Sequence, residues 1–343
     1  MKRRGHKVFF DTKSEVSADL ERLDRLVHDA DVVHLGRTGD PKLFAALLLG
    51  RKLYDYKLVV DTDDLVCEVP KYNPSSVHWH SATGLARLAL MQYREADLVT
   101  VSTPELLEDC MQHNGNVVEI PNCSNSDIYP EATRWRTKEA WHADDQRIYW
   151  GGGSGHYDDL LVLKGVLTRI FHERPNVKLI FSNFVPDWAA DLDPHRIFMI
   201  PFADFRTYAK VVAWLCADVA VAPLVDNSFN RAKSHVKYLD YTAARIPGVY
   251  SDLPPYRSVR DGVTGLKATT DDEWHRTITY LLDNPQRGRD IVKAARTHIN
   301  MEFTVDRWAS RYESMLTELI ERQTAPLPQK ITEGVTIECP TPL

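Results

Sequence analysis

The sequence has no apolar run long enough to cross a bilayer, no CxxC pair and no surplus of positive charge. A membrane-spanning helix needs about 20 apolar residues, so no transmembrane segment is predicted. The start, MKRRGHKVFF, lacks the apolar core of a signal peptide, and secretion is not predicted either. The formal net charge of -6 excludes a general electrostatic attraction for nucleic acid, so any phosphate site must be local.

The cysteines are few, odd in number and without the spacing of metal ligands or of a disulfide framework. They are Cys67, Cys110, Cys123, Cys216 and Cys339. We therefore expect reduced thiols, no metal site and a cytoplasmic location.

Short apolar runs alternate with amphipathic segments along most of the chain. The predicted strands of the first half are KVFFDT, DVVHLGR, KLVVDTDD, DLVTVST and NVVEIPN, and those of the second include RIYWGGGSGH, VKLIFSN, HRIFMIPF and DVAVAPLV. Strands that alternate with helices form parallel sheets, with ligand loops at the carboxyl ends of the strands. The sequence thus predicts an α/β protein with two Rossmann-like, doubly wound domains that face each other across a cleft.

The periodicity also predicts where the domains begin and end. The first domain is expected over residues 1–125, a linker over 126–145 and the second domain over 146–300. A helix over 301–322 could pack back on the first domain, and residues 323–343 are expected to form a flexible tail.

A glycine-rich stretch, YWGGGSGHYDDL, follows a predicted strand and opens a predicted helix. Glycines allow the backbone to approach a ligand, and a helix N-terminus favours phosphate. The stretch is neither GxGxxG nor a Walker loop, so an ordinary strand-to-helix turn explains it equally well. The candidate ligand contacts are Gly152, Gly153, Ser154, Gly155 and His156. His156 could instead cap the helix together with Asp158 and Asp159.

Helical spacing places Lys233, Lys237 and Asp240 on one face of a single predicted helix. Two ammonium groups near a helix N-terminus suit a diphosphate, and Asp240 could accept hydrogen bonds from ribose hydroxyls. The alternative is a solvated face with a surface ion pair, which contributes little to stability. For an isolated helix that alternative would be favoured.

The same segment resembles the nucleotide-sugar segment of the group 1 (family 4) glycosyltransferases of bacterial or phage type, which have the two-domain GT-B fold. In RAKSHVKYLDYTAARIPGVYSD, Asp240 falls at the acidic position of the family's EAMAxGxPVVAS pattern, Pro247 at its proline and Ser251 at its serine. The resemblance is specific over residues 218–265 and extends more weakly over residues 7–315.

Three parts of the family's pattern are missing, one of which is the usual arginine in the first loop of the second domain. The first of its paired glutamates would stand at Ala232, and Lys233 or Asn230 could take over part of its role. The start of the chain resembles the end of the family's first helix, so we expect the first domain to lack its first β-α unit.

The resemblance implies transfer of a sugar from a nucleotide diphosphate donor to a hydroxyl acceptor, with retention of configuration and without a metal. A UDP-sugar is the expected donor, and no cofactor is expected. Lys233 and Lys237 would stabilise the leaving diphosphate. The other predicted donor contacts are the glycine loop with His156, and Asn230, Ser234 and Asp240.

Candidates for the acceptor side come from the first domain. In DTDD, Asp63 is the candidate catalytic carboxylate, with Asp61 and Asp64 in acceptor recognition, although turn capping explains such a sequence more often. Arg37 and His80 are the other candidates, although solvated loop histidines are common. The acceptor could be a glycan, a lipid-linked glycan or a modified DNA base.

Two other functions stay open. One is a phage-type transferase that glycosylates a hydroxymethylated base in DNA, against which the negative charge argues. The other is a nucleotide-sugar-binding module without turnover, which the missing glutamate and the missing first β-α unit suggest. The oligomeric state is not predicted.

Overall fold

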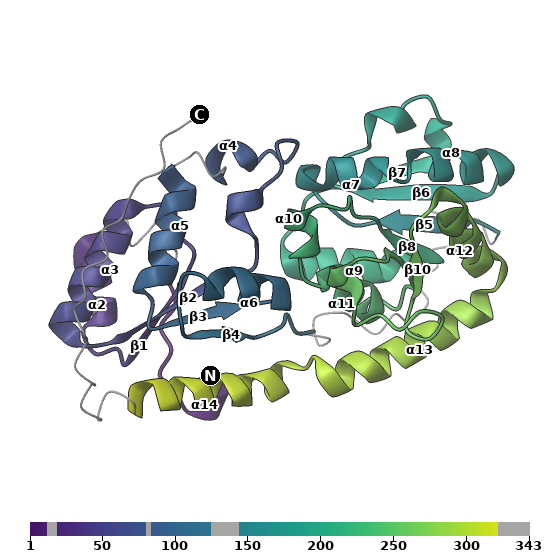
Figure 1. Cartoon of the computed structure of the whole chain (residues 1–343). Coiled ribbons are helices and arrows are strands. Elements are labelled where there is room, and N and C mark those ends of the chain that lie inside the picture. Colours follow the sequence, from purple (N-terminus) through teal and green to yellow (C-terminus); the bar gives the residue numbers. More distant parts are fainter. Residues whose placement is uncertain (12–18, 80–83, 125–143, 322–343) are drawn as a thin grey trace.

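The computed structural model describes residues 1–11, 19–79, 84–124 and 144–321. It contains two parallel sheets, one in each half of the chain, and two long helices run beneath both halves (Figure 1). The predicted tail, residues 323–343, is not among the described residues, and neither are most of the predicted linker and His80. No helix within these ranges is long and apolar enough to cross a membrane, and the four cysteines in them are free thiols.

The first sheet has four parallel strands in the order of the sequence. The strands are β1 (Val32–Gly36), β2 (Lys57–Thr62), β3 (Leu98–Val101) and β4 (Val117–Glu119). The helices are α2 (Leu20–Val27), α3 (Pro41–Tyr54), α4 (Ser76–Trp79), α5 (Gly84–Glu95) and α6 (Pro104–Met111). Short 3-10 turns lie at Lys2–Arg4 and Val66–Glu68.

The predicted strand KVFFDT is wrong for residues 7–11, which lie outside both sheets. Phe9 is 74% exposed and Phe10 is 89% exposed. An apolar run becomes a strand only where a neighbouring strand offers backbone hydrogen bonds, and this segment pairs with no strand of the described chain. The first sheet therefore begins at β1.

The second sheet has six parallel strands in the order β10-β9-β8-β5-β6-β7. Their bounds are β5 (Gln146–Trp150), β6 (Val177–Ser182), β7 (Ile197–Ile200), β8 (Val219–Ala222), β9 (Gly248–Ser251) and β10 (Leu266–Ala268). The helices are α7 (Tyr157–Leu161), α8 (Lys164–Glu173), α9 (Phe205–Leu215), α10 (Ser228–Arg231), α11 (Val236–Ala243) and α12 (Asp271–Asp283). The strand order reverses between β5 and β8, and open α/β sheets bind ligands at such a switch point.

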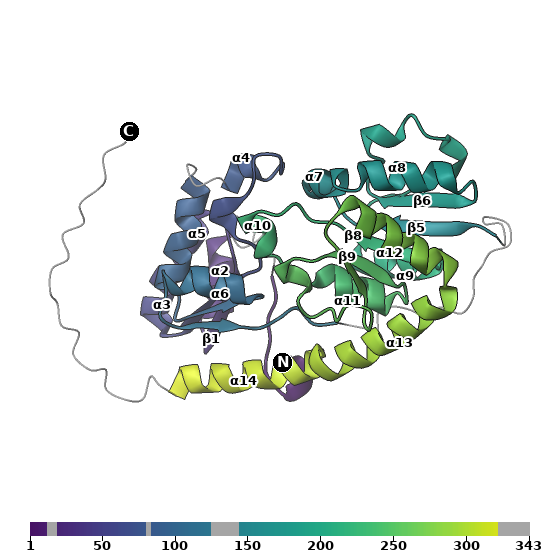
Figure 2. The ribbon, with the colours of Figure 1, turned by 45° about the vertical axis from the view of Figure 1, so that its right-hand side comes forward.

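The last two helices connect the two halves (Figure 2). The first, α13 (Pro285–Glu302), packs on the second domain through Ala295 and Ile299. The second, α14 (Val305–Glu321), places Leu319 against β2 and β3 of the first sheet. The turn between α13 and α14 contacts the end of the first domain. There the Ser124 N-H donates a hydrogen bond to the Phe303 carbonyl at 2.8 Å.

The start of β9 leaves no room for a side chain. A Cβ atom on Gly248 would overlap the phenol of Tyr250, which is 1% exposed and packed against Tyr241 and Tyr256. We expect Gly248→Ala to lower the free energy of unfolding by about 1 to 3 kcal/mol, as overpacked cores do. Urea unfolding measures the loss. Gly115→Ala is the control, since a Cβ there meets nothing within 4 Å, and an equal loss in both variants would contradict the steric argument.

Candidate functional site

A cavity of about 380 Å³ lies at the switch point of the second sheet and is closed on one side by the first domain. The second domain lines it with the loop after β5, with α9, and with the segment from Lys233 to Tyr241. The first domain contributes Asp63, Asp64 and Asn122. The lining thus combines carboxylates from one domain with lysines from the other.

The glycine loop reaches the cavity only with its two ends. Gly151, Gly152 and His156 line the cavity, whereas Gly153, Ser154 and Gly155 do not. A Cβ on Gly152 would lie 2.5 Å from the Trp150 indole, so a side chain is excluded there.

The middle of the loop turns toward the first domain instead. A Cβ on Gly155 would lie 3.3 Å from Asn73 Nδ2. The chain therefore leaves the cavity after Gly152 and returns to it at His156.

The lysine-bearing segment is two helices, and the prediction of one continuous helix is wrong. Residues Ala232 to His235 form a link between α10 and α11. The link is held by the first domain, because the Ala232 carbonyl accepts from Thr103 Oγ1 at 2.9 Å and Ser234 Oγ accepts from Asn122 Nδ2 at 2.7 Å. Both contacts fix the link against the first domain.

The predicted residues still converge despite the break in the helix. Lys233, Ser234, Lys237 and Asp240 all line the cavity. Lys233 reaches it from the link, and the other two charged side chains reach it from α11.

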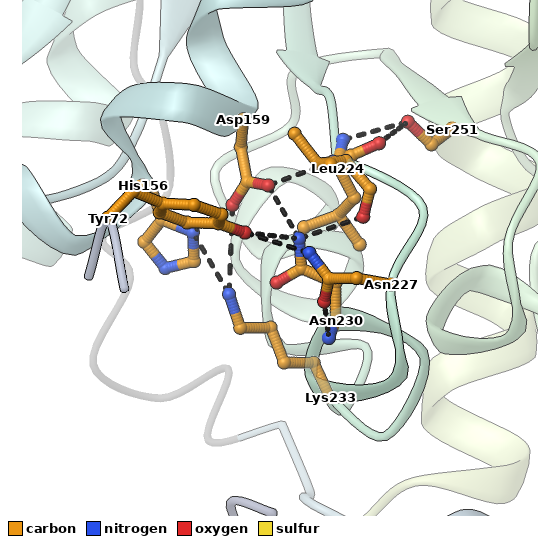
Figure 3. Close-up of polar contacts among 9 residues, drawn as sticks. Tyr72, His156, Asp159, Leu224, Asn227, Asn230, Lys233 and Ser251 are labelled. Atoms are coloured by element: carbon orange, nitrogen blue, oxygen red, sulfur yellow. Dashed lines mark hydrogen bonds and ion pairs between the residues drawn. The ribbon is translucent and has the colours of Figure 1, made fainter. Parts of the chain in front are cut away.

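A buried carboxylate lies next to Lys233 (Figure 3). Asp159, on α7, is 1% exposed and accepts hydrogen bonds from His156 Nδ1 at 2.8 Å, Asn230 Nδ2 at 2.7 Å and the Val225 N-H at 2.9 Å. Lys233 Nζ lies 3.7 Å from the same carboxylate. Asp159 therefore fixes three segments of the second domain relative to one another.

The first domain reaches the same cluster through Tyr72. Its hydroxyl accepts from Asn227 Nδ2 at 2.9 Å and lies 3.4 Å from Asn230 Nδ2. Asn230, a predicted donor contact, is 0% exposed and does not line the cavity. It holds Asp159 from beneath.

Lys233, Lys237 and His156 line the cavity close enough together to shift one another's pKa values. Burial, together with the neighbouring charge of Lys233, lowers the pKa of Lys237 to about 8. Lys237 and burial lower the pKa of His156 to about 4. Burial also lowers the pKa of Lys233, although Asp159 and Asp64 oppose it. The arrangement is suited to a ligand that brings negative charge.

The first-domain candidates have two different environments. Arg37 donates to Thr62 Oγ1 at 3.0 Å, stacks over Trp79 and lies within 4 Å of both Asp63 and Asp64. Burial and then Asp63 raise the pKa of Asp64. Neither Arg37 nor Asp61 lines the cavity.

Asp61 has a different environment from its two neighbours in DTDD. Its Oδ1 accepts from Thr100 Oγ1 at 2.5 Å on β3. Its charge also acts on Tyr312 of α14 and on His34 of β1. The Asp61 carboxylate therefore interacts with the first sheet and with α14, and it does not face the cavity.

Several lining residues carry no sequence signal that identifies them. They are Asn122, Asn183, Phe205, Tyr208, Tyr241 and Tyr256. Asn183 has a positive φ of 69° and donates through Nδ2 to the Gly152 carbonyl at 2.8 Å. Only an Asn at a strand end, a residue type tolerated in left-handed turns, could have indicated it.

Comparison with known proteins identifies the fold. No protein-family model and no curated protein sequence matches the chain. Solved structures match over nearly the whole length. Sucrose-phosphate synthase from Thermosynechococcus elongatus is 13% identical with a TM-score of 0.65, over 93% of this chain and 82% of that one. Anabaena HepE in complex with UDP and glucose is 14% identical with a TM-score of 0.66, over 91% and 84%. A glycosyltransferase from Rickettsia africae is 12% identical with a TM-score of 0.63, over 92% and 84%.

These structures are GT-B glycosyltransferases, and the chain has their fold, with two Rossmann-like domains. The fold implied by the sequence resemblance is therefore confirmed.

Proposed function

We propose that this protein is a glycosyltransferase that takes a sugar from a nucleotide diphosphate, with a UDP-sugar as the donor. The observation that carries the proposal is the convergence of Lys233, Lys237 and His156 on one cavity between two GT-B domains. The complexes of Anabaena HepE with UDP and with UDP-glucose support the choice of donor.

The proposed donor contacts follow from the lining. Lys233 and Lys237 face the diphosphate, and Asp240 accepts hydrogen bonds from the ribose. Phe205 and Tyr208 supply aromatic surface on which the base can stack. As the bond from the sugar to the diphosphate breaks, negative charge grows on the leaving oxygen. Ammonium groups held in place by the fold stabilise that charge without reorganising.

The acceptor is proposed to approach from the first domain. Asp63 and Asp64 line the cavity opposite the lysines, and their side chains are 67% and 40% exposed. Asp63 keeps the proposed catalytic role, and its carboxylate is placed to accept a proton from a hydroxyl. An acidic acceptor side favours an uncharged glycan hydroxyl over a phosphodiester, so nothing in the described site favours DNA. Retention, metal independence, the exact acceptor and the cytoplasmic location stay predictions.

Calorimetric titration with UDP-, GDP- and ADP-sugars tests the donor proposal on the full chain. We expect saturable binding of a UDP-sugar, and a folded sample that binds none of them would refute the proposal. Release of UDP on addition of neutral glycan acceptors, unchanged by EDTA, then separates a transferase from a binding module without turnover.

A further inference from the structure

His156 is oriented by the buried carboxylate of Asp159 (Figure 3). Its Nδ1 lies 2.8 Å from Asp159 Oδ2 and 3.4 Å from Lys233 Nζ. A carboxylate only accepts hydrogen bonds and an ammonium only donates them, so the proton on Nδ1 is the one that makes the shorter contact. The second nitrogen, Nε2, then carries the lone pair. Within the described part of the chain Nε2 has no hydrogen-bond partner, and His156 lines the cavity.

Charged groups from four segments surround this imidazole. Lys237 of α11 and Lys233 of the link bring positive charge, while Asp159 of α7 brings negative charge, and Asp64 of the first domain lies across the same cavity. The field of Lys237 and burial together hold the ring neutral near pH 7. A pyrophosphate in the cavity carries two negative charges, which oppose that field. The same charges repel the lone pair of a neutral Nε2.

We propose that His156 is a third cationic contact of the diphosphate: Nε2 takes a proton from solvent as the diphosphate binds. Nδ1 keeps its proton and its hydrogen bond to Asp159, which acts as a positioning residue. This inference rests on the proposed donor function and deepens it. It makes donor binding a proton-linked event, in which two lysines and one imidazolium hold the leaving group.

Calorimetry with UDP-glucose in buffers of different ionisation enthalpy counts the protons. Both phosphates of UDP-glucose stay ionised at about pH 6, and Lys237 is already charged there. We expect uptake of roughly half a proton or more per bound ligand. His156→Gln should abolish the uptake and weaken binding about 10-fold or more. The control His195→Gln, at an exposed site, should keep both.

A second variant tests the orientation. Both Asn230 Nδ2 and the Val225 N-H donate to Asp159 Oδ1, while His156 donates to Oδ2. In Asp159→Asn the amide oxygen must take the place of Oδ1, because Asn230 and Val225 both donate hydrogen bonds there. The amide nitrogen then takes the place of Oδ2 and donates toward His156 Nδ1. The histidine proton then moves to Nε2, which can donate to phosphate at once. This variant should bind UDP-glucose with almost no proton uptake.

The outcomes are distinct. Equal proton uptake in the wild type and in His156→Gln overturns the inference and leaves the transferase proposal standing. Loss of uptake in His156→Gln alone supports it, even where Asp159→Asn does not fold. A folded wild type that binds no nucleotide sugar overturns both.

Discussion

Replacing Lys237 by methionine should weaken the binding of a UDP-sugar by about 10- to 150-fold, the equivalent of roughly 1.5 to 3 kcal/mol for a hydrogen bond to a charged group. The same substitution should stabilise the folded protein. The ammonium group is buried near Lys233, and the lowered pKa of Lys237, about 8, means that the fold disfavours its charge. Methionine keeps the length and the apolar contacts of the side chain and removes that charge.

The pH dependence separates this effect from a general change in packing. In the unfolded chain the pKa of a lysine is about 10.4, and in the fold the pKa of Lys237 is about 8. Below about pH 8 both states hold the proton and the cost of the buried charge is complete. Between about pH 8 and pH 10 the folded state has lost the proton that the unfolded state keeps, so the wild type gains stability there. The advantage of Lys237→Met should therefore be constant below about pH 8 and shrink above it.

Thermal unfolding and calorimetry measure the two effects on one sample. A rise of about 2 to 4 °C in Tm corresponds to roughly 1 kcal/mol in a protein of this size. Lys164→Met is the matched control, because Lys164 is exposed at the start of α8, and it should change neither quantity. Unchanged donor affinity in Lys237→Met would remove this lysine from the site.

Asp159→Ala should have the largest effect on stability, a loss of about 3 to 5 kcal/mol, as when one partner of a buried ion pair is removed. The substitution leaves the Val225 N-H and the Asn230 amide without their acceptor. It also removes the carboxylate that lies 3.7 Å from Lys233 Nζ, and the Lys233 side chain is only 15% exposed. Each loss is a desolvation cost with no compensating contact.

Urea unfolding of Asp159→Ala and of Asp158→Ala checks this. Asp158 stands on the same helix, next in sequence, and is less buried than Asp159. We expect its loss to change the free energy of unfolding by no more than about 0.5 kcal/mol, the range of ordinary surface substitutions. Similar values for the two variants would show that the buried cluster adds no stability of its own.

The sequence predicts those parts of the site that are local in the chain. Lys237 and Asp240 share a face of α11 because helical periodicity puts residues three apart together. Lys233 joins them for a different reason, since it stands in a link whose shape depends on Thr103 and Asn122. Helical periodicity within residues 230–243 cannot predict those contacts, because Thr103 and Asn122 belong to the other domain.

Asp159 shows why the rest could not be predicted. Taken locally it is an acidic residue in the first turn of a short helix, where it is typical of dipole compensation. Its partners Val225 and Asn230 lie 66 and 71 residues further along the chain. Only the parallel pairing of β5 with β8 brings the loops that carry them side by side. Burial then changes a capping residue into the centre of a charged network.

The chain passes between the two domains at two places, and the residue at which the first passage begins lies next to the second. The first passage leaves the first domain at Ser124, and the second is the turn at Phe303 and Thr304 between α13 and α14. Because α14 packs on the first sheet and α13 on the second, a change in domain orientation must be accommodated at the turn between these two helices. We therefore expect the domains to open and close by a hinge motion about a single axis that passes through this turn. Donor entry and release would then separate the contact between Tyr72 and Asn227 and form it again.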